Sequence, residues 1–174
     1  MLRRKATPLS AIVRGTLAGV AGTVAMDLLL YRRYKRGGGT DGLFDWEFSA
    51  GTENYEQAAA PAHVGKRIVE GYLQTELAPG TARSMNNAVH WSTGLGWGLA
   101  HGILAGSAAR PRASYGLVTG TAAWAASYAA LAPTGLYQPM WKYPRSVLAN
   151  DLSAHLVFGF ATGAVFRALT RTRD

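Results

Sequence analysis

The chain has 174 residues, of which 48% are hydrophobic, and a net charge of +8 from 18 basic and 10 acidic side chains. It contains no cysteine, which excludes disulfide bonds, thiolate zinc sites and cysteine nucleophiles. The isoelectric point of about 10.1 is in the range of nucleic-acid-binding domains. However, the basic residues flank apolar segments instead of lining one face, and cations at helix ends bind anionic lipid headgroups. The composition therefore favours the lipid bilayer as partner and argues against nucleic acid.

Four apolar segments follow one another, at residues 9–31, 87–108, 113–132 and 152–169. Each is close to the ~20 residues that a helix needs to span a bilayer. A secretory signal peptide is the alternative for the first segment, but this segment is too long and a basic run follows it in place of a cleavage site. The sequence therefore predicts an all-α fold, with residues 1–174 forming a single membrane domain of four transmembrane helices.

Glycines spaced four residues apart recur in every apolar segment, and the second segment has an unbroken ladder of them. This spacing places small residues on one helix face and lets two backbones approach closely. The predicted helix-packing residues are Gly15, Gly19, Gly94, Gly98, Gly102, Gly106, Gly116, Gly120, Gly159 and Gly163. The ladder is expected to face another helix of the chain or a second copy of it, so a homo-oligomer is one prediction.

The loop between the first two segments, residues 32–86, has two parts. Residues 41–56 are acidic and aromatic, and we expect them to be irregular. Residues 61–77 carry Val64, Ile68 and Tyr72 on one helical face, which predicts an amphipathic helix. This helix lies at the membrane interface or packs onto the loop itself, and both alternatives stay open. A tight basic turn at residues 109–112 is predicted to join the second and third helices into an antiparallel hairpin.

Charge does not set the orientation of the predicted spans. Half of the 18 Lys and Arg residues fall on the side of the two termini and half on the side of the long loop, so the positive-inside rule favours neither. We expect both termini in the cytoplasm. The excess of arginine over lysine and the high alanine and glycine content are typical of a GC-rich bacterial genome.

Polar side chains inside a span are costly and need a reason. Asp27 and His90 lie about one turn from the loop-side ends of their predicted spans, and Asp151 and His155, which share one helix face, open the fourth. All four are therefore expected at a similar depth on the loop side. If they converge, they form a proton-relay or divalent-cation site, because imidazole titrates near neutral pH and is a common metal ligand. The alternative is structural: Asp151 caps the fourth helix, and His155 bonds across the bundle. His101 lies deeper and is expected to bond to a neighbouring helix.

No segment has the spacing of a catalytic motif. The sequence contains no Gly-x-Ser-x-Gly elbow. The glycine-rich run at residues 93–98 continues into a full apolar span, unlike a potassium-channel filter or a dinucleotide-binding loop. We therefore expect no catalytic residues, no cofactor and no enzymatic activity. An enzyme that acts on membrane lipids is kept as an alternative.

Short motifs in the second half of the chain are, in order, His90-Trp91, Tyr115-Gly-Leu117 with Gly120, Pro133-Thr-Gly-Leu136 and Asp151-Leu-Ser-Ala-His155. This pattern, mainly within residues 90–165, resembles the YagU-type family of small bacterial inner-membrane proteins. The resemblance implies a polytopic protein of the bacterial plasma (inner) membrane and supplies no catalytic residues. It does not extend to residues 50–77.

Together these patterns predict a non-enzymatic structural or accessory component of the plasma membrane, with lipid and another membrane protein as partners. The alternative is a small proton- or cation-conducting protein that uses the polar layer of Asp27, His90, Asp151 and His155.

Overall fold

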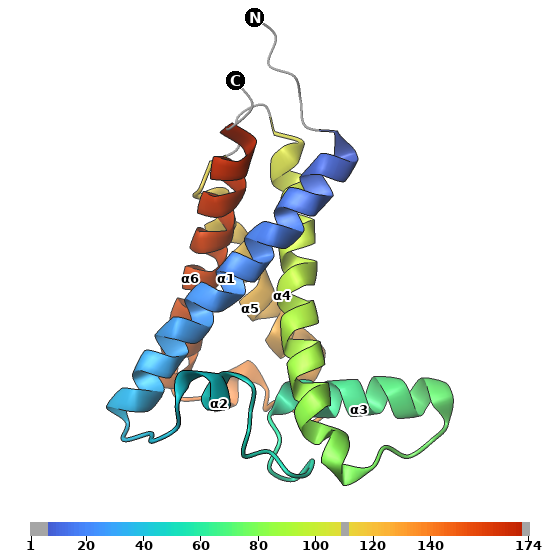
Figure 1. Ribbon diagram of the computed structural model, residues 1–174. Coiled ribbons are helices and arrows are strands. Elements are labelled where there is room, and N and C mark those ends of the chain that lie inside the picture. The colour runs from blue at the N-terminus through green and yellow to red at the C-terminus, as the bar shows by residue number, and fades with distance from the viewer. Residues whose placement is uncertain (1–6, 109–111, 172–174) are drawn as a thin grey trace, which may run out of the picture. The chain divides into compact units, whose positions relative to one another are not determined.

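The computed structural model describes residues 7–108 and 112–171, and within these ranges it contains helices and turns but no strand (Figure 1). The helices are α1 (Pro8–Arg36), α2 (Leu43–Glu47), α3 (Ala60–Leu73), α4 (Ala82–Gly106), α5 (Tyr115–Leu131) and α6 (Arg145–Arg171), with 3-10 turns at Pro79–Thr81 and Met140–Lys142. The all-α prediction is confirmed. Most of the predicted turn at residues 109–112 lies outside the described residues.

The chain divides into two compact units. The first unit holds α1 up to Leu29, α4 from Gly94 onward, and all of α5 and α6. The second unit is residues 30–93 and holds the end of α1, α2, α3 and the start of α4. Both α1 and α4 are single unbroken helices that contribute to each unit.

Two helices, α1 and α6, are long and apolar enough to cross a membrane, where the sequence analysis expected four spans. The α5 helix has 17 residues, fewer than the ~20 that a span needs. The α4 helix is long enough at 25 residues, but its glycines, tryptophans and histidines lower its mean hydropathy. The glycine spacing therefore identified helices that pack closely. It did not show whether each helix is apolar enough to cross a membrane.

Two helices begin earlier than predicted, because their first turns are polar and the prediction followed only the apolar segments. The α4 helix begins at Ala82 instead of residue 87, and α6 begins at Arg145, directly after Pro144, instead of residue 152. The predicted amphipathic helix ends at Leu73 instead of residue 77, since Gln74 takes a left-handed conformation with φ 52°. The stretch expected to be irregular contains the short helix α2.

In the first unit, α1 and α4 touch through their backbones. A Cβ atom added at Gly15 would lie 2.5 Å from the Gly98 carbonyl oxygen and 2.6 Å from the Gly102 Cα atom. One at Gly19 would lie 2.6 Å from the Gly94 carbonyl oxygen. The ascending order on α1 and the descending order on α4 show that the helices run antiparallel. All four ladder glycines face α1, which leaves the ladder unavailable to a second copy of the chain.

A second backbone contact joins α5 to α6. A Cβ at Gly163 would lie 3.0 Å from the Gly116 nitrogen, and one at Gly120 would lie 3.3 Å from the Gly159 Cα atom. The α1 helix also meets α6, because a Cβ at Gly22 would lie 2.8 Å from the Phe158 carbonyl oxygen. Between the helices, Ala18, Ala105 and Phe166 form a small buried cluster. The first unit thus has an interior made mostly of small residues.

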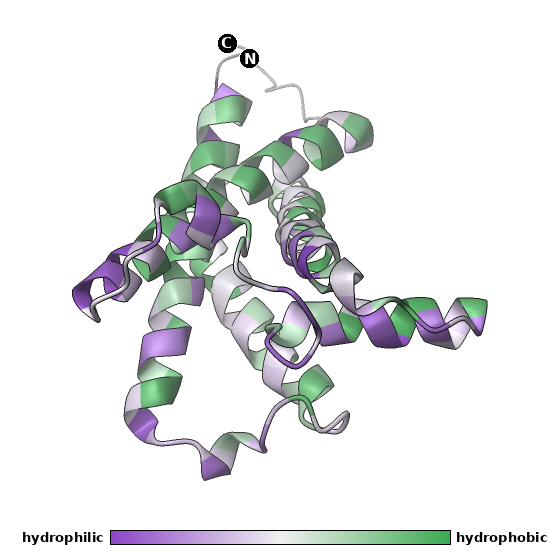
Figure 2. Ribbon diagram, turned by 60° about the horizontal axis from the view of Figure 1, so that its bottom comes forward, coloured by the Kyte–Doolittle hydropathy of each residue, from purple (hydrophilic) through white to green (hydrophobic). Residues whose placement is uncertain are grey.

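The second unit has its own core of Tyr55, Ala62 and Ala82, with Met85 packed against it. Gly65 of α3 also lies against Met85 and Val89 of α4. One face of α3 is therefore packed within the unit, while Ile68, Tyr72 and Leu73 remain exposed. In Figure 2, α3 is green along one edge and purple along the other. The amphipathic helix predicted for the loop is present, and its apolar surface is only partly covered by the unit.

Gly98→Ala is expected to destabilise the protein, because the new Cβ would lie 2.5 Å from the Gly15 carbonyl oxygen and the backbones must separate. Overpacking of this kind costs about 1–3 kcal/mol. Gly96→Ala is the matched control on the same helix, since no atom lies within 4 Å of its Cβ position. It should leave stability unchanged or raise it by up to about 1 kcal/mol. Thermal unfolding of purified protein, followed by circular dichroism, compares the two. Equal melting temperatures would contradict the backbone contact.

Candidate functional site

The C-terminal end of α2 is held onto the first turns of α4 by side-chain hydrogen bonds. The Phe48 carbonyl oxygen accepts from Arg83 Nε at 2.9 Å and from Asn87 Nδ2 at 3.0 Å. Asn86 Nδ2 donates to Ser49 Oγ at 2.9 Å. These three donors lie within the first two turns of one helix, so they fix where the α2 segment lies along α4.

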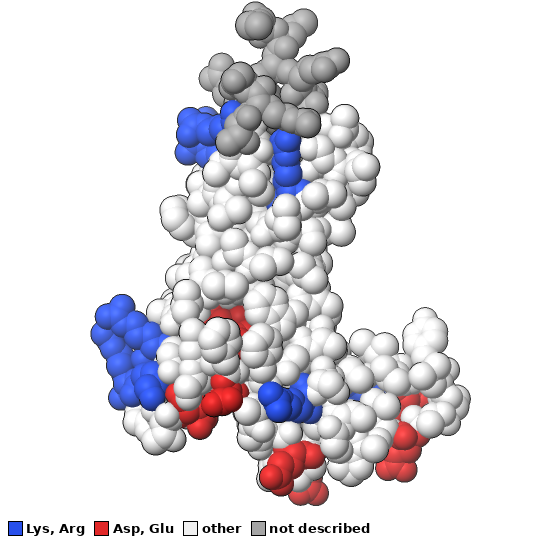
Figure 3. Space-filling view, viewed as in Figure 1, with Lys and Arg blue, Asp and Glu red and all other residues white. Residues whose placement is uncertain are grey.

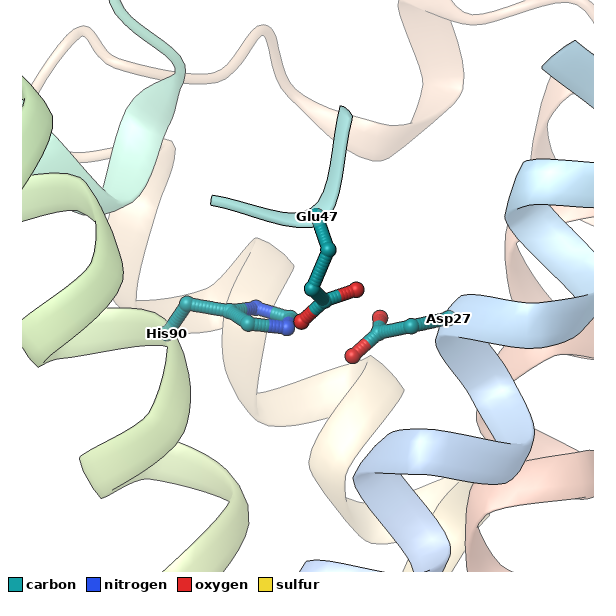
Figure 4. Close-up of side chains that lie close together, drawn as sticks. All are labelled: Asp27, Glu47 and His90. Carbon is teal, nitrogen blue, oxygen red and sulfur yellow. The ribbon is translucent and has the colours of Figure 1, made fainter. Parts of the chain in front are cut away.

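This docking brings Glu47 to His90 within the second unit. A carboxylate oxygen of Glu47 and a ring nitrogen of His90 lie within 4.8 Å of each other. Figure 4 shows the Glu47 carboxylate pointing toward the His90 ring. Both side chains are half-buried. The His90 ring packs edge-on against Trp91, with ring centroids 6.2 Å apart. A carboxylate and an imidazole in this arrangement can share a proton or bind one metal cation.

Asp27 belongs to the first unit, where it is 5% exposed on α1. It continues the four-residue spacing of Gly15, Gly19 and Thr23, so it shares the helix face that meets α4. On α4 the same spacing runs from the glycine ladder back through His90 to Asn86. The repeat changes from glycine to polar residues toward the C-terminal end of α1, and toward the N-terminal end of α4.

Asp151 and His155 form a second acid–histidine pair, on α6 in the first unit. His155 Nδ1 lies 3.4 Å from Asp151 Oδ1 and 3.0 Å from the Asp151 carbonyl oxygen. Among the described residues, no group of three or more potential metal ligands includes either of them. The predicted capping role of Asp151 is wrong, because α6 begins six residues earlier at Arg145. Of the four residues in the predicted polar layer, Asp27, Asp151 and His155 belong to the first unit, where Asp151 pairs with His155. His90 belongs to the second unit, where its neighbour is Glu47, a residue that was not predicted.

His101 lies in the interior of the first unit at 2% exposure. Its Nδ1 atom is 2.8 Å from Thr119 Oγ1 on α5, and its ring packs edge-on against Phe166 of α6 with centroids 5.4 Å apart. The expectation that His101 bonds to a neighbouring helix is confirmed. This histidine links three helices, and we assign it a structural role.

Sequence reasoning missed Glu47 and Asn86. Glu47 lies in a stretch read as irregular, and no local spacing connects it to a histidine 43 positions away. Asn86 could have been identified from the sequence, because it precedes His90 by one helical turn and continues the four-residue repeat of α4. The missing step was the position of α2, which depends on tertiary hydrogen bonds.

Comparison of the chain with protein families, with curated proteins and with solved structures found no match to any of them. The resemblance to the YagU-type family therefore stays a prediction.

Thr119→Val is expected to destabilise the protein by about 1–3 kcal/mol, because it leaves a buried His101 nitrogen without its partner. Thr121→Val is the control on the same helix, since the exposed Thr121 hydroxyl bonds only to the Leu117 carbonyl oxygen of its own helix. That change should stay within about 0.5 kcal/mol. Chemical unfolding in detergent measures both. A Thr119→Val protein as stable as the control would remove His101 from the structural network.

Proposed function

We propose that this chain is an integral protein of a bacterial plasma membrane and acts there as a non-enzymatic structural or accessory component. The observation that carries the proposal is the inverted packing of the first unit. Its interior holds glycine, alanine and threonine, while large apolar side chains point outward. Soluble proteins bury their large apolar residues, whereas helices packed in lipid place small residues at their contacts.

Exposure of individual side chains supports a lipid-facing surface. Leu104 is 74% exposed, Val118 is 71% exposed and Phe160 is 54% exposed, on three different helices. Only 33% of the most apolar window of α1, and the same share of α6, is buried. The core helix of a soluble protein would be mostly buried. Figure 3 shows a broad uncharged band on the first unit, with basic side chains at one end of the unit.

Threonine hydroxyl groups on these helices also have hydrogen-bond partners within their own helix. Thr23, Thr121 and Thr162 each donate to the carbonyl oxygen four residues earlier, at 3.0, 2.9 and 2.8 Å. A hydroxyl that bonds to its own helix needs no water, which lowers the cost of placing it in hydrocarbon. Because α4 and α5 are packed against α1 and α6 through glycines, we propose that all four helices are inserted together.

The second unit supports an interfacial position. Exposed Ile68, Tyr72 and Leu73 on α3 are side chains that insert among lipid headgroups and acyl chains. Lys66 donates to the Glu70 carboxylate one turn further on, and this bond lowers the pKa of Glu70 and raises that of Lys66. The pair therefore stays charged at neutral pH, as the aqueous side of an interfacial helix requires.

The second candidate is proton or cation conduction, which the acid–histidine pairs favour: Glu47 with His90 in one unit and Asp151 with His155 in the other. His155→Ala should then abolish a pH-dependent flux in liposomes. A wild-type protein without flux would leave the structural or accessory role as the proposal.

Membrane insertion predicts that the chain stays in the membrane pellet after washing with alkaline carbonate and is released only by detergent. Carbonate removes proteins held by charge or by a partner, but not helices whose surroundings are hydrocarbon. The partition is measured by centrifugation and immunoblotting. A folded, monodisperse chain in the detergent-free supernatant would contradict the proposal.

If four helices are inserted, the connections between them lie on alternating sides of the membrane. Labelling of single-cysteine variants can test this, because the chain has no native cysteine. Thr75→Cys and Gln138→Cys lie in the connections before α4 and before α6, and Ser107→Cys lies just after α4; all three positions are exposed. With four spans, a membrane-impermeant maleimide labels the first two from one side of the membrane and Ser107→Cys only from the other. Labelling of all three from one side would mean that only α1 and α6 cross.

A further inference from the structure

We propose that Glu47 and His90 are ligands of a divalent transition-metal cation. Their ligand atoms lie within 4.8 Å of each other, and one cation with ligand distances of about 2.0–2.2 Å can join two such atoms after a small adjustment. A set that includes an imidazole nitrogen selects Zn²⁺, Cu²⁺, Ni²⁺ or Fe²⁺ over Mg²⁺ and Ca²⁺, which prefer oxygen ligands alone. The inference goes beyond the proposed membrane role and does not depend on it.

The backbone that carries Glu47 is fixed before any cation arrives. The residue that follows Glu47, Phe48, accepts hydrogen bonds from Arg83 and Asn87 on α4. His90 stands one turn further along the same helix. Ligands that are positioned by surrounding hydrogen bonds bind a metal more tightly than free surface side chains do, because less motion is lost on binding.

Asn86 supplies an independent indication of a ligand. Its Nδ2 atom donates to Ser49 Oγ, while its Oδ1 atom is buried and has no hydrogen-bond partner. A buried carbonyl oxygen without a donor costs about 1–3 kcal/mol. Asn86 precedes His90 by one turn, so this oxygen is on the same face of α4. A cation at Glu47 and His90, or a water bound to that cation, would satisfy it.

The experiment uses the full chain, purified in detergent with a tag that contains no histidine and stripped of metal with EDTA. Isothermal titration with Zn²⁺ should show one binding event per chain, and Mg²⁺ should bind far more weakly. Glu47→Gln and His90→Ala should each weaken Zn²⁺ binding at least ~10-fold, since even losing a residue that only orients a ligand has effects of that size. Co²⁺ in place of Zn²⁺ should give a visible absorption band that His90→Ala shifts.

Asp151→Asn and His155→Ala are the matched controls, because they alter an acid–histidine pair that belongs to no larger group of potential ligands among the described residues. They should leave the Zn²⁺ affinity unchanged. Unfolding curves recorded in EDTA show that each variant is folded. The proposal is overturned if the wild-type chain does not bind Zn²⁺, or if Glu47→Gln and His90→Ala bind it as tightly as the wild type.

Discussion

Contact between helix backbones is the constraint on which the first unit depends. The α1 helix meets α4, and α5 meets α6, at places where a single Cβ atom would collide with backbone atoms of the neighbour. Dispersion between closely spaced main-chain atoms and weak Cα–H···O bonds hold such pairs together, and both decline steeply with distance. The pairs are therefore specific to the glycine register. A slip by one residue would place larger side chains between the helices.

This kind of packing determines what the outside of the unit looks like. Small residues occupy the contacts, so the larger apolar residues of α1, α4, α5 and α6 have no interior to fill. Few large apolar side chains of the unit are fully buried, Phe158 and Phe166 among them. Folding in water gains roughly 25 cal/mol for each Å² of apolar surface buried, and the loss of chain entropy opposes that gain. An interior of glycine and alanine gains little by this route, whereas in hydrocarbon the exposed leucines and valines carry no penalty.

Local patterns in the sequence were enough for the helical class, for the close-packing glycines and for the amphipathic face of α3. Each depends on residues a few positions apart, and helix geometry alone relates such residues in space. The starts of α4 and α6 could not be read this way, because their first turns are polar and resemble loop. The pairing of Glu47 with His90 was also out of reach. The pairing depends on the hydrogen bonds that Arg83 and Asn87 donate to the Phe48 carbonyl oxygen at the end of α2. The spacing of these residues in the sequence does not predict those bonds.

The four-residue repeats of α1 and α4 have their smallest residues where the two helices are closest. Where α1 and α4 touch, the repeat positions are Gly15 and Gly19 on one helix and Gly98 and Gly102 on the other. Next along α1 comes Thr23, whose hydroxyl already occupies the space where Gly94 lacks a side chain. Straight helices that cross at an angle separate on either side of their contact, so positions beyond it can hold longer side chains. On α1 the next repeat position holds Asp27, which is 5% exposed. On α4 the repeat leads from Gly94 back to His90. The residues that hold the helices together and those that can carry chemistry are thus consecutive members of the same repeats.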